Sequence, residues 1–186
     1  MKDHQMKSSN DYIERLQSEF VKAITNGFLA FPEGVDNSNP LNSTPFFTSF
    51  LEFSNRMDFS LRRKKLLVHL AALITEISER GMEPQVLMIG GSFLDASNLS
   101  PNDIDCVIFY RSGVQSIATA GQWMSTIRDR AKAVRLDARF VPTDGNLVVL
   151  LRSAIYFASL YRESKNGADS RGVVLLDCLD FIKLAR

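Results

Sequence analysis

The hydrophobic pattern of the chain changes after Pro84, and this change constrains the fold more than any other feature. Short apolar runs separated by turns replace the helical spacing that precedes them. Runs of this length predict strands, and strands interleaved with helices are typical of a unit built around a sheet. We therefore expect an α/β fold class, with α and β mixed. The expected strands are 86–89, 104–110, 134–141 and 172–176, and the expected helices are 114–133 and 147–162.

The first part of the chain is predicted to be mainly helical, because its apolar residues recur at helical spacing. A segment rich in proline and asparagine between the first two helices reads as a surface loop. The expected elements are helices at 11–25 and 46–53, a longer helix from a cap at Asp58 or Ser60 to Arg80, and a loop at 28–45. With 186 residues, one domain is expected. Within it, a helical N-terminal region at 1–82 should pack on a core at 83–186.

The charge and cysteine content of the chain indicate which partners and which cellular compartment to expect. The chain has 22 basic and 21 acidic residues, so its net charge of +1 excludes a global field that would coat nucleic acid. Both cysteines, Cys106 and Cys178, lie in apolar runs, which indicates buried thiols in a reducing compartment. No segment resembles a secretory signal or a membrane span. A soluble cytoplasmic protein without a membrane partner is expected.

The turn Gly90-Gly91-Ser92 follows a predicted strand directly. Glycine after a strand allows a sharp turn that brings backbone amides close to a phosphate, and a serine hydroxyl adds a donor. This turn therefore predicts a nucleotide-binding loop. Such turns also occur for conformational reasons alone, so the motif needs support from the residues that follow.

Three aspartates supply that support. Asp103 and Asp105 flank Ile104 at the start of a predicted strand, and residues i and i+2 of a strand share a face. A later strand offers Asp137 between Arg135 and Arg139, all three on one face. Carboxylate oxygens suit Mg²⁺ or Mn²⁺. The pattern predicts a divalent-metal site in which Asp137 is the third metal ligand or the general base, with Arg139 near the phosphates.

Simpler interpretations remain open for each of these features. The Asp103–Asp105 pair would also suit a solvated strand end, and a strand with alternating Arg135, Asp137 and Arg139 would suit a charged sheet edge. The basic run Arg62–Lys65 would suit RNA phosphates or a solvated helix face.

The order of glycine-serine, aspartate-x-aspartate and a later strand aspartate resembles the signature of the DNA polymerase β-like nucleotidyltransferases, in particular their minimal bacterial members. The resemblance covers about residues 85 to 141. It implies a mixed sheet flanked by helices, Mg²⁺ (or Mn²⁺), and transfer of a nucleoside monophosphate from an NTP, such as ATP, to a hydroxyl acceptor. In that role Gly91 and Ser92 match the phosphate loop, and Asp103, Asp105 and Asp137 match the metal ligands.

The resemblance leaves the acceptor open among an RNA end, a protein and a small molecule. It also implies work beside a protein partner or in a homo-oligomer, as in toxin–antitoxin or antiviral phage-defence systems. The alternative from another class is a non-catalytic binding or regulatory subunit with the same fold, such as an antitoxin-like partner. A pyrophosphokinase of the guanosine-tetraphosphate type uses related chemistry, but the glycine-serine loop matches it less well.

Overall fold

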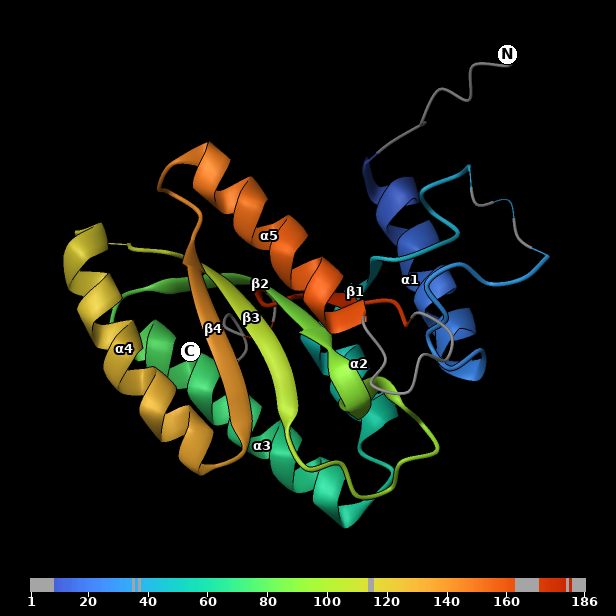
Figure 1. Ribbon diagram of the computed structural model, residues 1–186, viewed down its shortest axis with the longest axis horizontal. Helices are drawn as coiled ribbons and strands as arrows, with labels where there is room; N and C mark the ends of the chain where they lie inside the picture. The colour runs from blue at the N-terminus through green and yellow to red at the C-terminus, as the bar shows by residue number, and fades with distance from the viewer. Residues whose placement is uncertain are drawn as a thin grey trace.

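The computed structural model describes residues 9–34, 36, 38–113, 116–162, 171–179 and 181. Its centre is a mixed five-stranded sheet in the order β1-β5-β2-β3-β4, with helices on both faces (Figure 1). The strands are β1 Phe46–Ser49, β2 Glu83–Gly90, β3 Ile104–Arg111, β4 Leu136–Pro142 and β5 Val174–Asp177. The helices are α1 Ser9–Thr25, α2 Phe50–Met57, α3 Leu61–Glu79, the 3-10 turn η1 Gly91–Leu94, α4 Ile117–Ala133 and α5 Leu147–Arg162. This architecture confirms the expected α/β fold class.

The directions of the strands follow from their connections. β2 turns back through η1 and pairs antiparallel with β3, with Gly90 opposite Asp105. β3 reaches β4 through the crossover helix α4, so these two strands run parallel. β5 pairs antiparallel with β2 and parallel with β1. The ends of β2, β3 and β4 that carry the predicted site residues therefore lie at one end of the sheet.

The two faces of the sheet bury different sets of residues. Along β3, Ile104, Cys106 and Ile108 belong to a large core shared with α1 to α4. The alternate residues Val107 and Phe109 belong to a smaller core beneath α5. Asp105 lies between Ile104 and Cys106 on the strand, so its side chain points to the α5 face. Figure 1 shows α5 lying alone across this face of the sheet.

The segment 46–53 differs from its prediction as a helix. Phe46–Ser49 is the strand β1, and a helix begins only at Phe50, where the Ser49 side chain accepts a hydrogen bond from the backbone N–H of Glu52. β1 pairs with β5, more than a hundred residues away in the chain. Local spacing cannot reveal such a partner. The N-terminal region thus adds a strand to the sheet of the core, and the division at residue 82 stays a prediction.

Most other predicted elements are confirmed with small shifts at their ends. Ser60, one of the two proposed caps, accepts a hydrogen bond from the N–H of Arg63 at the start of α3. β4 begins at Leu136 and not at Val134, because Arg135 has a φ of 67°, in the left-handed region. The prediction that Arg135 shares a strand face with Asp137 and Arg139 was therefore wrong.

Both cysteines are buried and unbridged, as expected from their apolar neighbours. In the part of the chain that the structure describes, no helix combines the length and the apolar character that crossing a membrane requires.

Candidate functional site

Two of the three predicted carboxylates lie side by side on the α5 face. Asp105 of β3 and Asp137 of β4 are direct partners in the parallel register. Neighbouring strands lie about 4.8 Å apart, so two such side chains on the same face are within reach of one ion. Both residues are partly exposed. The strand pairing thus concentrates negative charge at one accessible end of the sheet.

Asp103 is placed differently from its two companions. It lies one residue before the first residue of β3 and is half-buried. Among the residues that the structure describes, no three His, Cys, Asp or Glu side chains form a group that could hold a metal ion. The structure therefore brings Asp105 and Asp137 together but does not gather Asp103 with them as a third ligand.

The glycines of the predicted phosphate loop lie directly against this pair. Gly91 has a φ of +69°, and a Cβ added there would stand 2.1 Å from Oδ2 of Asp105. At Gly90, an added Cβ would stand 2.4 Å from Cβ of Tyr161 in α5. A side chain at either position would collide with a residue of the site. Both glycines are therefore required by close approach, and Ser92 follows them, exposed, in η1.

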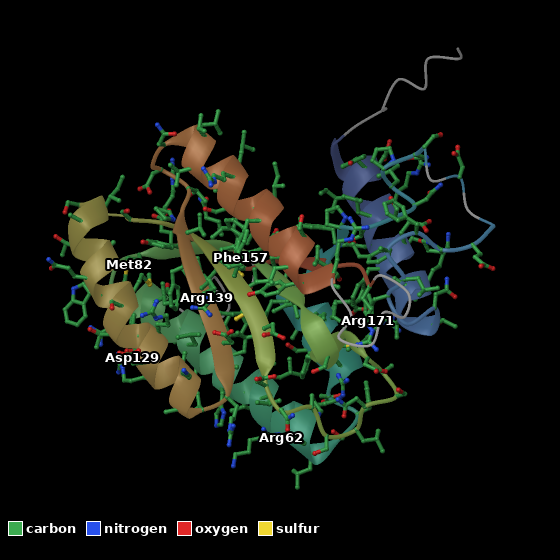
Figure 2. All side chains as sticks on the ribbon, viewed as in Figure 1. Arg62, Met82, Asp129, Arg139, Phe157 and Arg171 are labelled. Carbon is green, nitrogen blue, oxygen red and sulfur yellow. The ribbon has the colours of Figure 1, made fainter. Side chains whose placement is uncertain are left out.

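A cation stands next to the carboxylates. Nη2 of Arg139 lies 3.1 Å from Oδ1 of Asp137, and both side chains are more than two-fifths exposed. Arg139 is two residues beyond Asp137 on β4, and Figure 2 shows it in front of the central strands. An exposed pair of this kind contributes little to stability. The ion pair therefore places a positive charge beside the two carboxylates without fixing it there.

The thiol nearest to the site is not a nucleophile. Cys106 follows Asp105 on β3, but its side chain points into the opposite core and is fully buried. Burial raises the pKa of Cys106, and the charges of Asp105 and Asp137 raise it further. Since only the thiolate is reactive, this cysteine has a packing role.

Sequence reasoning missed Tyr161. Within α5, all of whose residues are described, it is the one residue that is buried. Its ring lies against Gly90, the strand partner of Asp105, so it belongs to the site. No local pattern distinguishes it from the other aromatic residues of α5, because its position depends on the contact with Gly90.

Arg63 was misjudged as part of a solvated or RNA-binding run. Its guanidinium is fully buried, between the rings of Phe59 at 4.3 Å and Phe93 at 4.6 Å. It donates to the backbone carbonyls of Asn98 at 3.0 Å and Asp95 at 2.5 Å. Burial lowers the pKa of Arg63, and the charge of Asp95 opposes this shift.

Arg62 extends the same interaction with the loop that joins η1 to β3. It donates to the carbonyl of Pro101 at 3.0 Å and to that of Asn102. The two arginines at the start of α3 thus hold the backbone that leads to Asp103 and Asp105. Lys64 and Lys65 are the exposed members of the run.

The two carboxylates match the ligands that a divalent ion prefers. Mg²⁺ is usually held by one or two carboxylates together with water and substrate phosphates, and not by a cage of protein groups alone. Asp105 and Asp137 provide two aligned carboxylates, and the backbone of Gly91 lies directly beside them. The residues present therefore fit an ion that a nucleotide helps to hold.

Fold and site together define an α/β protein with paired carboxylates at the end of a mixed sheet. Residues 30–177 match the model of DUF6932, a family of unknown function. This match spans most of the chain, so the chain belongs to that family. No curated protein and no solved structure was found to match it.

Proposed function

We propose that the protein is a metal-dependent nucleotidyltransferase that moves a nucleoside monophosphate from an NTP to a hydroxyl acceptor. The observation that carries this proposal is the register of Asp105 and Asp137 on adjacent parallel strands. They stand beside a glycine turn that has no room for a side chain. The resemblance to polymerase β-like nucleotidyltransferases, drawn from the order of the same motifs, adds support.

Each residue has a distinct part in the proposed reaction. Asp105 and Asp137 would hold Mg²⁺ or Mn²⁺, and Asp103 would join them only after the segment before β3 moves closer. When bound, a divalent ion neutralises charge on the departing pyrophosphate and lowers the pKa of the attacking hydroxyl. Arg139 would leave Asp137 to contact the phosphates, and the backbone of Gly90, Gly91 and Ser92 would lie along them.

The proposal specifies an acceptor with a hydroxyl group and does not specify the molecule that carries it. An RNA end, a protein hydroxyl and a small molecule are all compatible with a partly exposed pair of carboxylates. We place this activity in the cytoplasm, and the resemblance favours work beside a protein partner, as in toxin–antitoxin or phage-defence systems.

The test is transfer of label from each of the four NTPs, labelled at the α-phosphate, to total cellular RNA or protein, with Mg²⁺ or Mn²⁺ present. Asp105→Asn and Asp137→Asn keep the shape of the side chain and remove its charge. Asp129→Asn, at an exposed position on α4, is the matched control (Figure 2). We expect transfer by the wild type and by Asp129→Asn, and a loss of at least 100-fold in both site variants. Transfer that survives in the site variants would contradict the proposal.

A non-catalytic binding or regulatory subunit is the second candidate function. The surface of α5 favours it, because this helix exposes seven large apolar residues: Leu147, Val148, Val149, Leu151, Ile155, Tyr156 and Leu160. Contiguous apolar surface is typical of sites that bind another protein. Failure of the purified chain to bind any NTP with metal, combined with stable self-association in sedimentation, would favour this candidate.

A further inference from the structure

The ring of Tyr161 is fixed between α5 and the end of β2. It packs on Phe157, with ring centroids 6.0 Å apart. Its other side covers Gly90, where an added Cβ would stand 2.8 Å from Cγ of the tyrosine. Gly90 is the strand partner of Asp105, which in turn is the partner of Asp137. Tyr161, Asp105 and Asp137 therefore occupy successive positions across one face of the sheet.

The hydroxyl of Tyr161 is the unusual part of this arrangement. The residue is 8% exposed, and its Oη is buried without a hydrogen-bond partner among the described residues. A buried phenol oxygen nearly always has a partner, since leaving it without one is costly. Thr48, Ser54 and Arg63 also have a buried polar atom without a partner, but Tyr161 is the one of these four residues whose ring lies against the strand partner of Asp105. The hydroxyl would have a hydrogen-bond partner if a bound ligand accepted from it.

The protonation state of Tyr161 suits a donor. Burial raises its pKa, and the negative charges around it, including Asp105 and Asp137, act in the same direction, while Arg139 opposes them. The hydroxyl thus keeps its proton at neutral pH. An anionic oxygen brought to the carboxylates with a cation would be its natural acceptor, because a hydrogen bond to a charged group is about twice as strong as a neutral one.

We propose that Tyr161 Oη donates a hydrogen bond to a phosphate oxygen of the polyphosphate chain that binds at Asp105 and Asp137. This inference rests on the proposed function and adds a positioning contact from α5, the helix that covers the site. It also explains Gly90, whose missing side chain lets the tyrosine ring reach the sheet.

The test uses Tyr161→Phe, which removes the hydroxyl alone, with Tyr156→Phe as the matched control. Tyr156 lies on the same helix and is 60% exposed. Affinity is measured by isothermal titration calorimetry with two probes in the presence of Mg²⁺: α,β-methylene NTP analogues and inorganic tripolyphosphate. We expect Tyr161→Phe to weaken both probes by about ten-fold or more and Tyr156→Phe to weaken neither. The melting temperature of the ligand-free Tyr161→Phe protein should equal or exceed that of the wild type.

Each of the other outcomes would contradict either the contact of Tyr161 with the phosphates or the proposed function. If the wild type binds the analogues and Tyr161→Phe binds them equally well, the tyrosine contact is wrong and the proposed function stands. If only the nucleotide analogues are weakened, the hydroxyl does not contact the phosphates. If ligand-free Tyr161→Phe is clearly less stable, the hydroxyl has a structural partner. If the wild type binds neither probe, the contact and the proposed function both fail.

Discussion

At Gly91 the backbone conformation and a neighbouring carboxylate both exclude a side chain. Its φ is +69°, and an added Cβ would stand 2.1 Å from Oδ2 of Asp105. We expect Gly91→Ala to lower the free energy of unfolding by about 1–3 kcal/mol, because strain and displacement of the carboxylate add together. Urea denaturation measures this loss.

Gly121 provides the matched control for Gly91. It lies in α4, and an added Cβ there meets nothing within 4 Å. Since alanine is the better helix former, Gly121→Ala should raise the free energy of unfolding by about 0.5–1 kcal/mol. Equal effects of the two substitutions would show that the contact with Asp105 does not restrict residue 91.

Asp95 lies in the loop after η1, and its protonation should make the free energy of unfolding depend on pH. Its carboxylate accepts from the Ser97 hydroxyl at 2.6 Å and pairs with Arg171 at 2.7 Å. The Ser97 hydrogen bond lowers the pKa of Asp95, with a further contribution from Arg171 that burial opposes. The folded pKa is therefore below the unfolded one. The stabilisation is present above about pH 3.9 and is lost as the pH falls through the folded pKa.

Asp95→Asn tests this linkage. We expect it to cost about 1 kcal/mol at pH 7 and almost nothing once the pH is below the folded pKa of Asp95, since the wild-type carboxyl is then neutral as well. Denaturant unfolding of both proteins across this pH range measures the difference, with Asp129→Asn on α4 as control. A difference that is constant with pH would mean that the charge of Asp95 is unimportant.

At the scale of elements, the start of α3 is what holds the loop between η1 and β3. Arg63 satisfies two loop carbonyls from a buried position between Phe59 and Phe93. Arg63→Met keeps most of the volume but leaves those carbonyls without donors. It should therefore cost about 2–4 kcal/mol. Lys64→Met, at the exposed neighbouring position, should change stability by less than about 0.5 kcal/mol.

A small effect of Arg63→Met in thermal or chemical unfolding would contradict this account of the loop. A large effect should be accompanied by faster hydrogen exchange at residues 95 to 102, because the loop loses its anchor while the strands on either side remain paired.

The two sides of α5 should respond oppositely to substitution. Phe157 packs in the core beneath the helix, whereas Ile155 is 67% exposed. We expect Phe157→Ala to cost about 2–3 kcal/mol and Ile155→Lys less than about 0.5 kcal/mol in chemical unfolding. A large cost for Ile155→Lys would place that side chain in an interface, and its dependence on protein concentration would identify the interface as one between copies.

At the scale of the whole molecule, local patterns predicted most of the helices and strands and the proximity of Asp105 and Asp137. The short apolar runs after Pro84 predicted the strands that carry Asp105 and Asp137, and their order along the chain favoured adjacent positions. β1 was not predicted, because Phe46–Ser49 forms a strand only through its pairing with β5. Arg135 was assigned to β4 since alternation alone does not reveal a left-handed backbone.

The roles of the buried polar side chains could not be predicted from the sequence, because these roles also depend on the folded structure. In the sequence, Arg63 is one of four consecutive basic residues near the start of a helix. Only the folded loop places backbone carbonyls around its guanidinium. Tyr161 reads as one aromatic residue in an apolar helix, and only the approach of α5 to Gly90 brings it to the carboxylates. Both depend on contacts between segments that are distant in the chain.

The most direct test of the central claim is binding of Mn²⁺, followed by electron paramagnetic resonance, with and without an α,β-methylene NTP analogue. Wild type, Asp105→Asn, Asp137→Asn and the control Asp129→Asn are compared. We expect the analogue to tighten Mn²⁺ binding to the wild type and the control, and both site variants to lose this binding. Mn²⁺ binding that is absent from the wild type, or unchanged in Asp105→Asn and Asp137→Asn, would contradict the central claim.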